Sequence, residues 1–192
     1  CRMTMSEWMR GCVTTLGTAE GEKATTVGTV EDGALAQGPK PGQLARAFGM
    51  QPIGYDVYWD QDFATKHGVE RCQDMRDLFP RVDYLSLHTN LTPETRELIC
   101  AETISLLKPD AILLNCARGE IIHTADVAEA LRSGALRGYG TDVLDEEPPS
   151  ENHPLTHLPN CLVTPHIGSR TRESVQRQAV AAVTNLINAM RG

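Results

Sequence analysis

The stretch C-L-V-T-P-H-I-G-S, residues 161–169, determines how the rest of the chain is interpreted. The apolar run Cys161 to Val163 predicts a short buried strand, and Pro165 ends it. One histidine, His166, follows at the carboxyl end of this strand, just before a long helical pattern. Open α/β sheets bind their ligands at that edge. The stretch therefore predicts a site centred on His166.

Apolar strand-like runs alternate with helical segments along most of the remaining chain, and several of the runs end in polar residues. We expect strands over residues 25–30, 52–55, 69–72, 84–88, 111–115, 138–142 and 161–163, and helices over 43–48, 60–67, 74–79, 101–107 and 175–190. A further helix is expected with Thr124 as its cap and Gly134 as its end. This alternation predicts parallel βαβ units, and hence an α/β fold with a doubly wound parallel sheet.

Composition excludes several classes of partner. The formal net charge is -7, and no cluster of lysines or arginines is present, which argues against nucleic acid and anionic membranes. The six cysteines show no C-x-x-C spacing, so we expect reduced thiols and a cytoplasmic location. The chain contains no run of about 18 apolar residues, the length needed to span a membrane. The chain opens on Cys1, and residues 1–24, which lack a sustained period, are interpreted as the start of a fragment.

An arginine, Arg118, follows the apolar strand expected over residues 111–115. A loop arginine often pairs with a surface carboxylate. Alternatively, its planar guanidinium binds the carboxylate of a substrate with two parallel hydrogen bonds. The position of Arg118 favours neither interpretation over the other.

The acidic run from Asp142 to Pro149 also follows an expected strand, and by itself it is typical of a solvated loop. A lone histidine such as His166 is more often a buried structural residue than a catalytic one. If Glu147 reaches His166, the presence of both residues favours a catalytic role for His166 over a structural one. A carboxylate beside an imidazole fixes its tautomer and raises its pKa, which makes a competent proton acceptor and donor near neutral pH.

Two further positions concern cofactors. Asp56 ends the second expected strand, where nucleotide-binding α/β domains place an acid for the ribose hydroxyls, and a carboxylate there favours NAD over NADP. An ordinary turn aspartate is the alternative. His153 and His157 are four residues apart, but Pro154 lies between them in a loop, so no metal site is expected.

Taken together, several spaced segments resemble the D-isomer-specific 2-hydroxyacid dehydrogenases, the family of 3-phosphoglycerate dehydrogenase and glyoxylate/hydroxypyruvate reductase. The resemblance extends from about Gln43 to Met190, and several motifs in the same order are more specific than any single one. The segments are F-G-M-Q-P-I-G-Y-D (48–56), D-Y-L-S-L-H-T-N-L-T-P-E-T (83–95), L-L-N-C-A-R-G-E-I-I (113–122), G-T-D-V-L-D-E-E-P-P (140–149) and N-H-P-L-T-H-L-P-N-C-L-V-T-P-H-I-G-S (152–169).

The resemblance implies a Rossmann-like NAD-binding domain over residues 25–192 and a hydride transfer between NAD and a small D-2-hydroxy or 2-oxo acid. It implies that Arg118 binds the substrate carboxylate, that His166 is the acid/base and that Glu147 is its partner. The 3-phosphoglycerate and hydroxypyruvate/glyoxylate specificities both stay open. A homodimer assembled through this domain is expected. The resemblance also implies a set of cofactor-binding residues, namely Gly33, Leu35, Asp56, Thr89, Cys116, Arg118, Asp142, His166 and Gly168.

The chain departs from the family pattern in two places. The substrate-covering second lobe, formed in the family mainly by upstream residues, is not expected in this chain. The glycine-rich loop that should follow the first strand is also altered, because the family register G-x-G-x-x-G falls on Glu31 to Ala36 and retains only Gly33. A register shifted to Gly33–Gly38 keeps the outer glycines only. This second departure leaves a rival open, a non-catalytic NAD-sensing or corepressor-like interaction module on the same scaffold.

Overall fold

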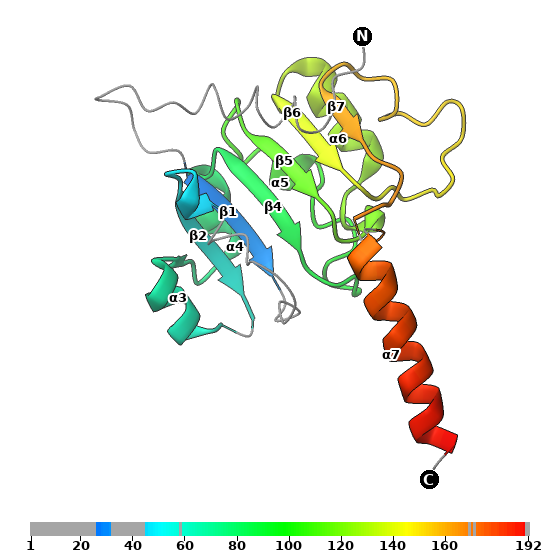
Figure 1. Cartoon of the computed structure of the whole chain (residues 1–192). Helices are drawn as coiled ribbons and strands as arrows, with labels where there is room; N and C mark the ends of the chain where they lie inside the picture. The colour runs from blue at the N-terminus through cyan, green and yellow to red at the C-terminus, as the bar shows by residue number, and fades with distance from the viewer. Residues whose placement is uncertain (1–25, 32–44, 58, 169, 171, 191–192) are drawn as a thin grey trace.

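The computed structural model describes residues 26–31, 45–57, 59–168, 170 and 172–190. Within these residues the strands form one parallel sheet of seven strands in the order β3-β2-β1-β4-β5-β6-β7 (Figure 1). From β1 the chain builds outward through β2 and β3, and it then returns to the other side of β1 with β4. The order therefore reverses between β1 and β4, and the predicted doubly wound parallel fold is confirmed.

The elements lie close to the positions that the sequence predicts. The strands are β1 (Thr26–Glu31), β2 (Gln51–Asp56), β3 (Glu70–Arg71), β4 (Tyr84–His88), β5 (Ile112–Asn115), β6 (Gly138–Thr141) and β7 (Cys161–Val163). The helices are α3 (Gln61–His67), α4 (Met75–Leu78), α5 (Ala101–Ile104), α6 (Thr124–Ser133) and α7 (Arg172–Met190), with two 3-10 turns, η1 (Phe79–Arg81) and η2 (Gly119–Ile121).

The core lies around the central strands and is mainly aliphatic, as the scarcity of aromatic residues predicts. In β4 alternate side chains are buried, with Leu85 and Leu87 fully covered. In β5 Leu113 is fully buried, and Tyr139 of β6 is the largest fully buried side chain. Each such side chain contributes about 1.5–3 kcal/mol to folding when it is removed from water. This burial fixes the register of the strands, and hence the edge at which their carboxyl ends meet.

Helix boundaries follow from local chemistry, with one correction. Asp60 caps α3, because its carboxylate accepts a hydrogen bond from the Phe63 N–H at 2.8 Å. Gly134 ends α6 in the left-handed conformation with φ of 80°, as predicted. The prediction that Thr124 caps α6 is wrong. Thr124 is the first helical residue, and the cap position belongs to His123, which makes no side-chain capping bond.

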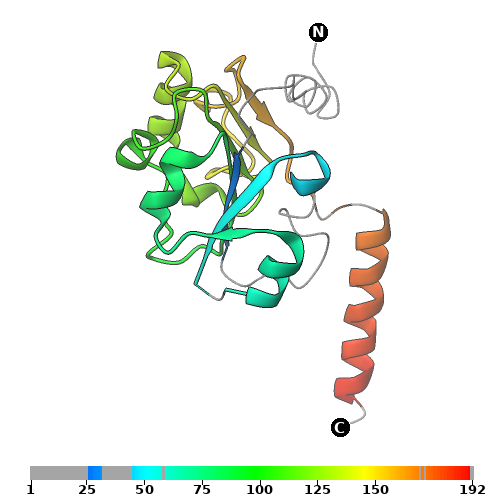
Figure 2. The same ribbon diagram turned by 90° about the vertical axis from the view of Figure 1, so that its left-hand side faces the viewer.

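Helix α7 projects away from the sheet in both views (Figures 1 and 2). Residues 175–190 of this helix are exposed, and they include the predicted apolar stripe. Leu186 is 61% exposed and Met190 is 79% exposed. The amphipathic pattern is therefore present, but within the described residues the apolar face of α7 has no covering surface. No helix of the described residues is long and apolar enough to cross a membrane.

Candidate active site

The residues singled out from the sequence gather at the carboxyl edge of the sheet, where β5, β6 and β7 end side by side. Arg118 lies three residues beyond β5, Asp142 directly follows β6, and His166 lies three residues beyond β7. His166 adopts a left-handed backbone conformation with φ of 51°, which is uncommon for a residue with a side chain. Such positions persist where surrounding contacts impose them, and two sets of hydrogen bonds do so here.

The first set joins His166 to Glu147. The Nδ1 atom of His166 lies 2.7 Å from Oε2 of Glu147, and the other carboxylate oxygen accepts the N–H of Leu144 at 2.9 Å. These hydrogen bonds, that from His166 foremost, lower the pKa of the Glu147 carboxyl. Because an ionised carboxylate can only accept, Nδ1 carries the proton of the shared bond. The Nε2 atom of His166 is thus the ring nitrogen left to take or release a proton.

The second set braces the loop that carries His166 on Asp142. One carboxylate oxygen of Asp142 accepts the hydroxyl of Thr164 at 2.5 Å and the N–H of Ile167 at 2.9 Å, and the other accepts the N–H of Gly168 at 2.7 Å. Burial of Asp142 would raise the pKa of its carboxyl, but these three hydrogen bonds outweigh the burial and lower it. Residues on both sides of His166 are therefore tied to one buried carboxylate.

Two glycines permit close approaches in this region. A Cβ atom on Gly168 would lie 2.9 Å from the carboxylate of Asp142. A Cβ atom on Gly119 would overlap the carbonyl group of Leu144, so the Leu144–Asp145 peptide rests directly on Gly119. Because backbone atoms cannot move aside as a flexible side chain does, this contact couples the turn after β5 to the loop that carries Glu147.

The turn that presents Arg118 is shaped by Asn115, which is fully buried. The side chain of Asn115 accepts the N–H of Ala117 at 3.0 Å and donates to the carbonyl of Arg118 at 2.9 Å. The Arg118 guanidinium is exposed and donates to the carbonyl of Ala117 at 2.6 Å. Within the described residues no carboxylate forms an ion pair with it. Its charge is therefore available to an anionic ligand.

The remaining predicted cofactor residues are distributed along the same edge. Asp56 ends β2 and lies opposite Glu31 in the register of β1. Thr89 directly follows β4 and is 6% exposed, and Cys116 directly follows β5 and is exposed. The predicted positions Gly33 and Leu35 lie outside the described residues. Asp56 and Thr89 thus flank the reversal between β1 and β4, whereas Cys116 lies with the Arg118, Asp142 and His166 group.

This arrangement fits a dinucleotide. In sheets of this topology the ligand binds at the carboxyl edge, across the point where the strand order reverses. The exposed Cys116 and the imidazole of His166 lie at one end of that edge, and an acid, Asp56, lies at the end of β2. No group of three or more His, Cys, Asp or Glu side chains within the described residues could hold a metal ion.

Sequence reasoning missed one polar pair near the site. His153, which it considered only as a metal ligand, is 3% exposed, and its Nε2 atom lies 2.9 Å from Oδ1 of Asp145. The signal that would have indicated a structural role is the neighbourhood of His153. Leu155, two residues further along the chain, is apolar and fully buried.

Comparisons with known proteins identify the family of the chain. Residues 6–168 match the family model described as "D-isomer specific 2-hydroxyacid dehydrogenase, NAD binding domain". That match begins well before Gln43, where the motif resemblance begins, and it ends before α7. The D-3-phosphoglycerate dehydrogenase of Methanocaldococcus jannaschii is 40% identical over 167 residues, which are 87% of this chain and 31% of the relative. The glyoxylate reductase of Aeropyrum pernix is 36% identical over 165 residues, 86% of this chain and 48% of the relative.

A solved structure, that of the TT0316 protein from Thermus thermophilus, superimposes with a TM-score of 0.79 and 39% identity. The match covers 88% of this chain and 52% of that protein. The chain therefore spans between about a third and a half of the length of these relatives. The curated relatives are named as a dehydrogenase and a reductase. The chain belongs to the D-isomer specific 2-hydroxyacid dehydrogenase family, and it corresponds to the family's NAD-binding domain.

Proposed function

We propose that the protein containing this chain oxidises a small D-2-hydroxy acid, or reduces the matching 2-oxo acid, with NAD as the hydride carrier. The observation that carries the proposal is the 2.7 Å hydrogen bond between His166 and Glu147 at the carboxyl edge of the sheet. A buried structural histidine, the alternative interpretation, does not account for a side chain that is 48% exposed. An oriented, accessible imidazole instead suits proton transfer.

In this mechanism Arg118 binds the substrate carboxylate through its exposed guanidinium and orients C2. When bound, NAD would supply the acceptor or the donor of the hydride at C2. In the oxidative direction His166 takes the hydroxyl proton on Nε2 as the C2 hydride leaves, and the hydroxyl becomes a carbonyl. Glu147 stabilises the resulting imidazolium and keeps Nδ1 protonated throughout. In the reductive direction the same nitrogen returns the proton to the forming hydroxyl.

For the cofactor we propose that Asp56 holds the adenosine ribose and that Asp142 lies near the carboxamide. We also propose that residues 25–192 form the dinucleotide-binding unit. Support comes from Asp56 at the end of β2 and from Asp142 after β6, whose carboxylate binds the loop that carries His166. The other proposed contacts are Gly33, Leu35, Thr89, Cys116, Arg118, His166 and Gly168. Both 3-phosphoglycerate and hydroxypyruvate/glyoxylate are candidate substrates, since relatives of both names match the chain.

Calorimetric titration of this chain with NADH, with NADPH as the control, tests cofactor binding. We expect binding of NADH in the micromolar range and much weaker binding of NADPH, because the Asp56 carboxylate would oppose a 2′-phosphate. Asp56→Ala should reduce this discrimination. A folded chain that bound neither dinucleotide would refute the cofactor proposal.

Activity is tested in the longer protein that carries the substrate lobe. His166→Ala should reduce hydroxy-acid oxidation by at least about 10²-fold, the usual contribution of a general acid/base. His157→Ala is the matched control, because His157 is an exposed histidine whose recorded hydrogen bond is to the carbonyl of Glu151. Equal rates for the His166 variant and the wild type would exclude this mechanism.

We further propose that the protein is cytoplasmic and assembles as a homodimer through this domain. Support for the dimer comes from the exposed apolar face of α7, which includes Val183, Leu186 and Met190. Sedimentation of this chain should reveal a species of twice its 21.0 kDa mass. Leu186→Glu should dissociate it, whereas Asn188→Glu, on the opposite face at helical spacing, should not. A wild-type chain that stays at 21.0 kDa would refute a dimer made by this chain alone.

A further inference from the structure

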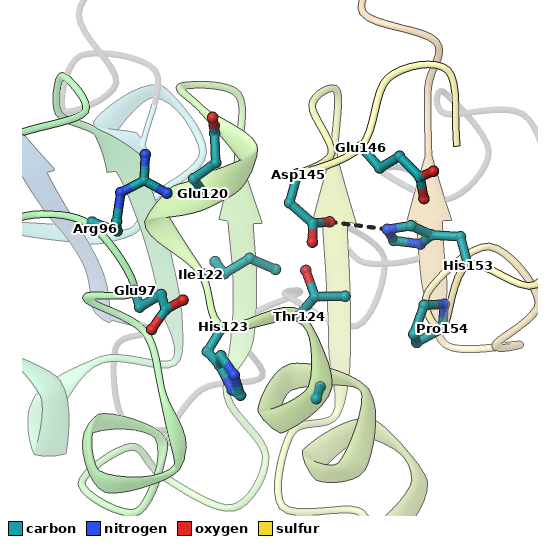
Figure 3. Close-up of a pocket in the computed structure, with 11 residues that line it drawn as sticks. Arg96, Glu97, Glu120, Ile122, His123, Thr124, Asp145, Glu146, His153 and Pro154 are labelled. Atoms are coloured by element: carbon teal, nitrogen blue, oxygen red, sulfur yellow. Dashed lines mark hydrogen bonds and ion pairs between the residues drawn. The ribbon is translucent and has the colours of Figure 1, made fainter. Parts of the chain in front are cut away.

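The loop that carries Glu147 has little packing of its own. Every residue from Asp145 to Asn152 is exposed, and His153 is the next buried residue. Beneath this part of the loop is a pocket of about 510 Å³, whose walls include Asp145, Glu146, His153 and Pro154 (Figure 3). Because every residue from Asp145 to Asn152 is exposed, burial of apolar side chains does not fix the position of Glu147.

Two contacts hold the ends of this segment. At its start the Leu144–Asp145 peptide rests on Gly119. At its end the buried His153 side chain reaches back to Asp145, 2.9 Å from ring nitrogen to carboxylate oxygen, as Figure 3 shows. The hydrogen bond closes residues 145–153 into one loop, and Leu155, fully buried, anchors the chain just beyond it.

The tautomer of His153 follows from its two partners. Its Nδ1 atom accepts the N–H of Leu155 at 3.3 Å, so Nε2 carries the proton and donates to Asp145. Burial would raise the pKa of the Asp145 carboxyl, but hydrogen bonds, that from His153 foremost among them, lower it. Both nitrogens of a nearly fully buried ring are thus satisfied only while the loop stays closed.

A continuous path leads from this pair to His166. His153 holds Asp145, and the residue before Asp145, Leu144, donates its N–H to Oε1 of Glu147 at 2.9 Å. The other oxygen of Glu147 binds Nδ1 of His166. The donor N–H lies in the Val143–Leu144 peptide, so a shift of the backbone at Leu144 and Asp145 would weaken one of the two hydrogen bonds that orient the Glu147 carboxylate.

We propose that His153 is a positioning residue for the reaction, which acts through its hydrogen bond to Asp145 to hold the Glu147 carboxylate against His166. This inference rests on the proposed function for its catalytic consequence, but the geometric part stands on the His153–Asp145–Leu144–Glu147 contacts alone. The rival explanation is a purely structural histidine that stabilises the fold without affecting Glu147.

Matched variants separate the two explanations. His153→Asn keeps an acceptor near the place of Nδ1 for the N–H of Leu155 but is too short to reach Asp145. His153→Gln carries its amide nitrogen near the place of Nε2 and restores the donor. Asp145→Ala breaks the same hydrogen bond from the exposed side, and Asp145→Asn keeps an acceptor oxygen. The Asp145 pair serves if a substitution of the buried histidine unfolds the chain.

The first readouts need no activity and use this 192-residue chain. In His153→Asn and Asp145→Ala, we expect the pKa of Glu147, followed by carboxyl NMR, to rise toward its ordinary value. The amide of Leu144 should exchange with solvent at least about tenfold faster, because its hydrogen bond to Glu147 opens more often. His153→Gln and Asp145→Asn should remain close to wild type. Unchanged Glu147 titration and Leu144 exchange in folded His153→Asn and Asp145→Ala would overturn the proposal.

The catalytic readout uses the longer protein with its substrate lobe. His153→Asn should lower kcat by about 10- to 100-fold with KM nearly unchanged, since small misplacement of a catalytic group is costly whereas substrate binding by Arg118 is untouched. His153→Gln should recover most of the rate. If the NMR changes occur but even the wild type transfers no hydride, the proposed function fails and the positioning contact stands. If His153→Asn and His153→Gln change kcat by the same factor and KM by the same factor, His153 has a structural role only.

Discussion

Replacing Asp142 with asparagine tests how the His166 loop is held. The carboxylate of Asp142 accepts three hydrogen bonds and is 7% exposed, so it is well shielded from water. Asparagine can keep the two bonds at Oδ1, from Thr164 and Ile167, but as neutral ones. Its amide nitrogen would face the N–H of Gly168, donor against donor. Bonds to charged groups are worth about 1.5–3 kcal/mol each and neutral ones about 0.5–1.5 kcal/mol.

The expected loss in free energy of unfolding follows from these values. Weakening two bonds costs about 1 kcal/mol each, and losing the third costs about 1.5–3 kcal/mol, less what water returns to the exposed Gly168. We expect a loss of about 3 kcal/mol for Asp142→Asn, measured by urea unfolding near pH 7. Thr164→Val, which removes only the hydroxyl donor at nearly constant shape, should cost about 1 kcal/mol.

The pH dependence of this difference gives a second check. The pKa of Asp142 is lowered in the folded chain relative to its ordinary value of 3.8. A carboxyl whose pKa is lower in the folded chain than in the unfolded chain stabilises the fold at pH values above its pKa in the unfolded chain. This contribution is lost as the pH falls through its pKa in the folded chain. The gap between wild type and Asp142→Asn should therefore shrink below about pH 4. A loss under about 0.5 kcal/mol, or a gap that is constant with pH, would refute the bracing argument.

Three further predictions follow. Gly119→Ala should lower the free energy of unfolding in urea by more than about 3 kcal/mol, because the added Cβ would overlap the carbonyl group of Leu144. Backbone atoms cannot move aside as a flexible side chain does. A variant as stable as the wild type would contradict this contact. In the longer protein, Glu147→Gln should lower kcat at least about tenfold. In the wild type, protonation of Glu147 below its ordinary pKa should contribute to the fall in rate at acidic pH, and this contribution should be absent in the variant. An unchanged pH–rate profile would show that Glu147 does not support His166. Asp60→Ala should cost about 1 kcal/mol through loss of the α3 cap, without any change in NADH affinity in calorimetry.

Most of the fold was predictable because its signals are local. Apolar runs such as those of β4 and β5 become strands wherever they can be buried, and glycines such as Gly134 stop helices through their own backbone freedom. The position of His166 just beyond a strand was predictable for the same reason. The cap of α6 was not, because Thr124 and His123 are one residue apart, and only the observed backbone decides between them.

The amino-acid sequence alone predicts the alternation of elements, the parallel sheet and the gathering of Arg118, Asp142 and His166 at one edge, because burial of periodic apolar residues leaves little choice of register. The partners of the polar groups, in contrast, are established only in the folded chain. Glu147 finds His166 from 19 residues away, and Asp142 binds the N–H of Gly168 from 26 residues away. These pairings depend on loop conformations, and a loop is held by the sum of contacts from several distant strands. No local pattern of residues encodes that sum.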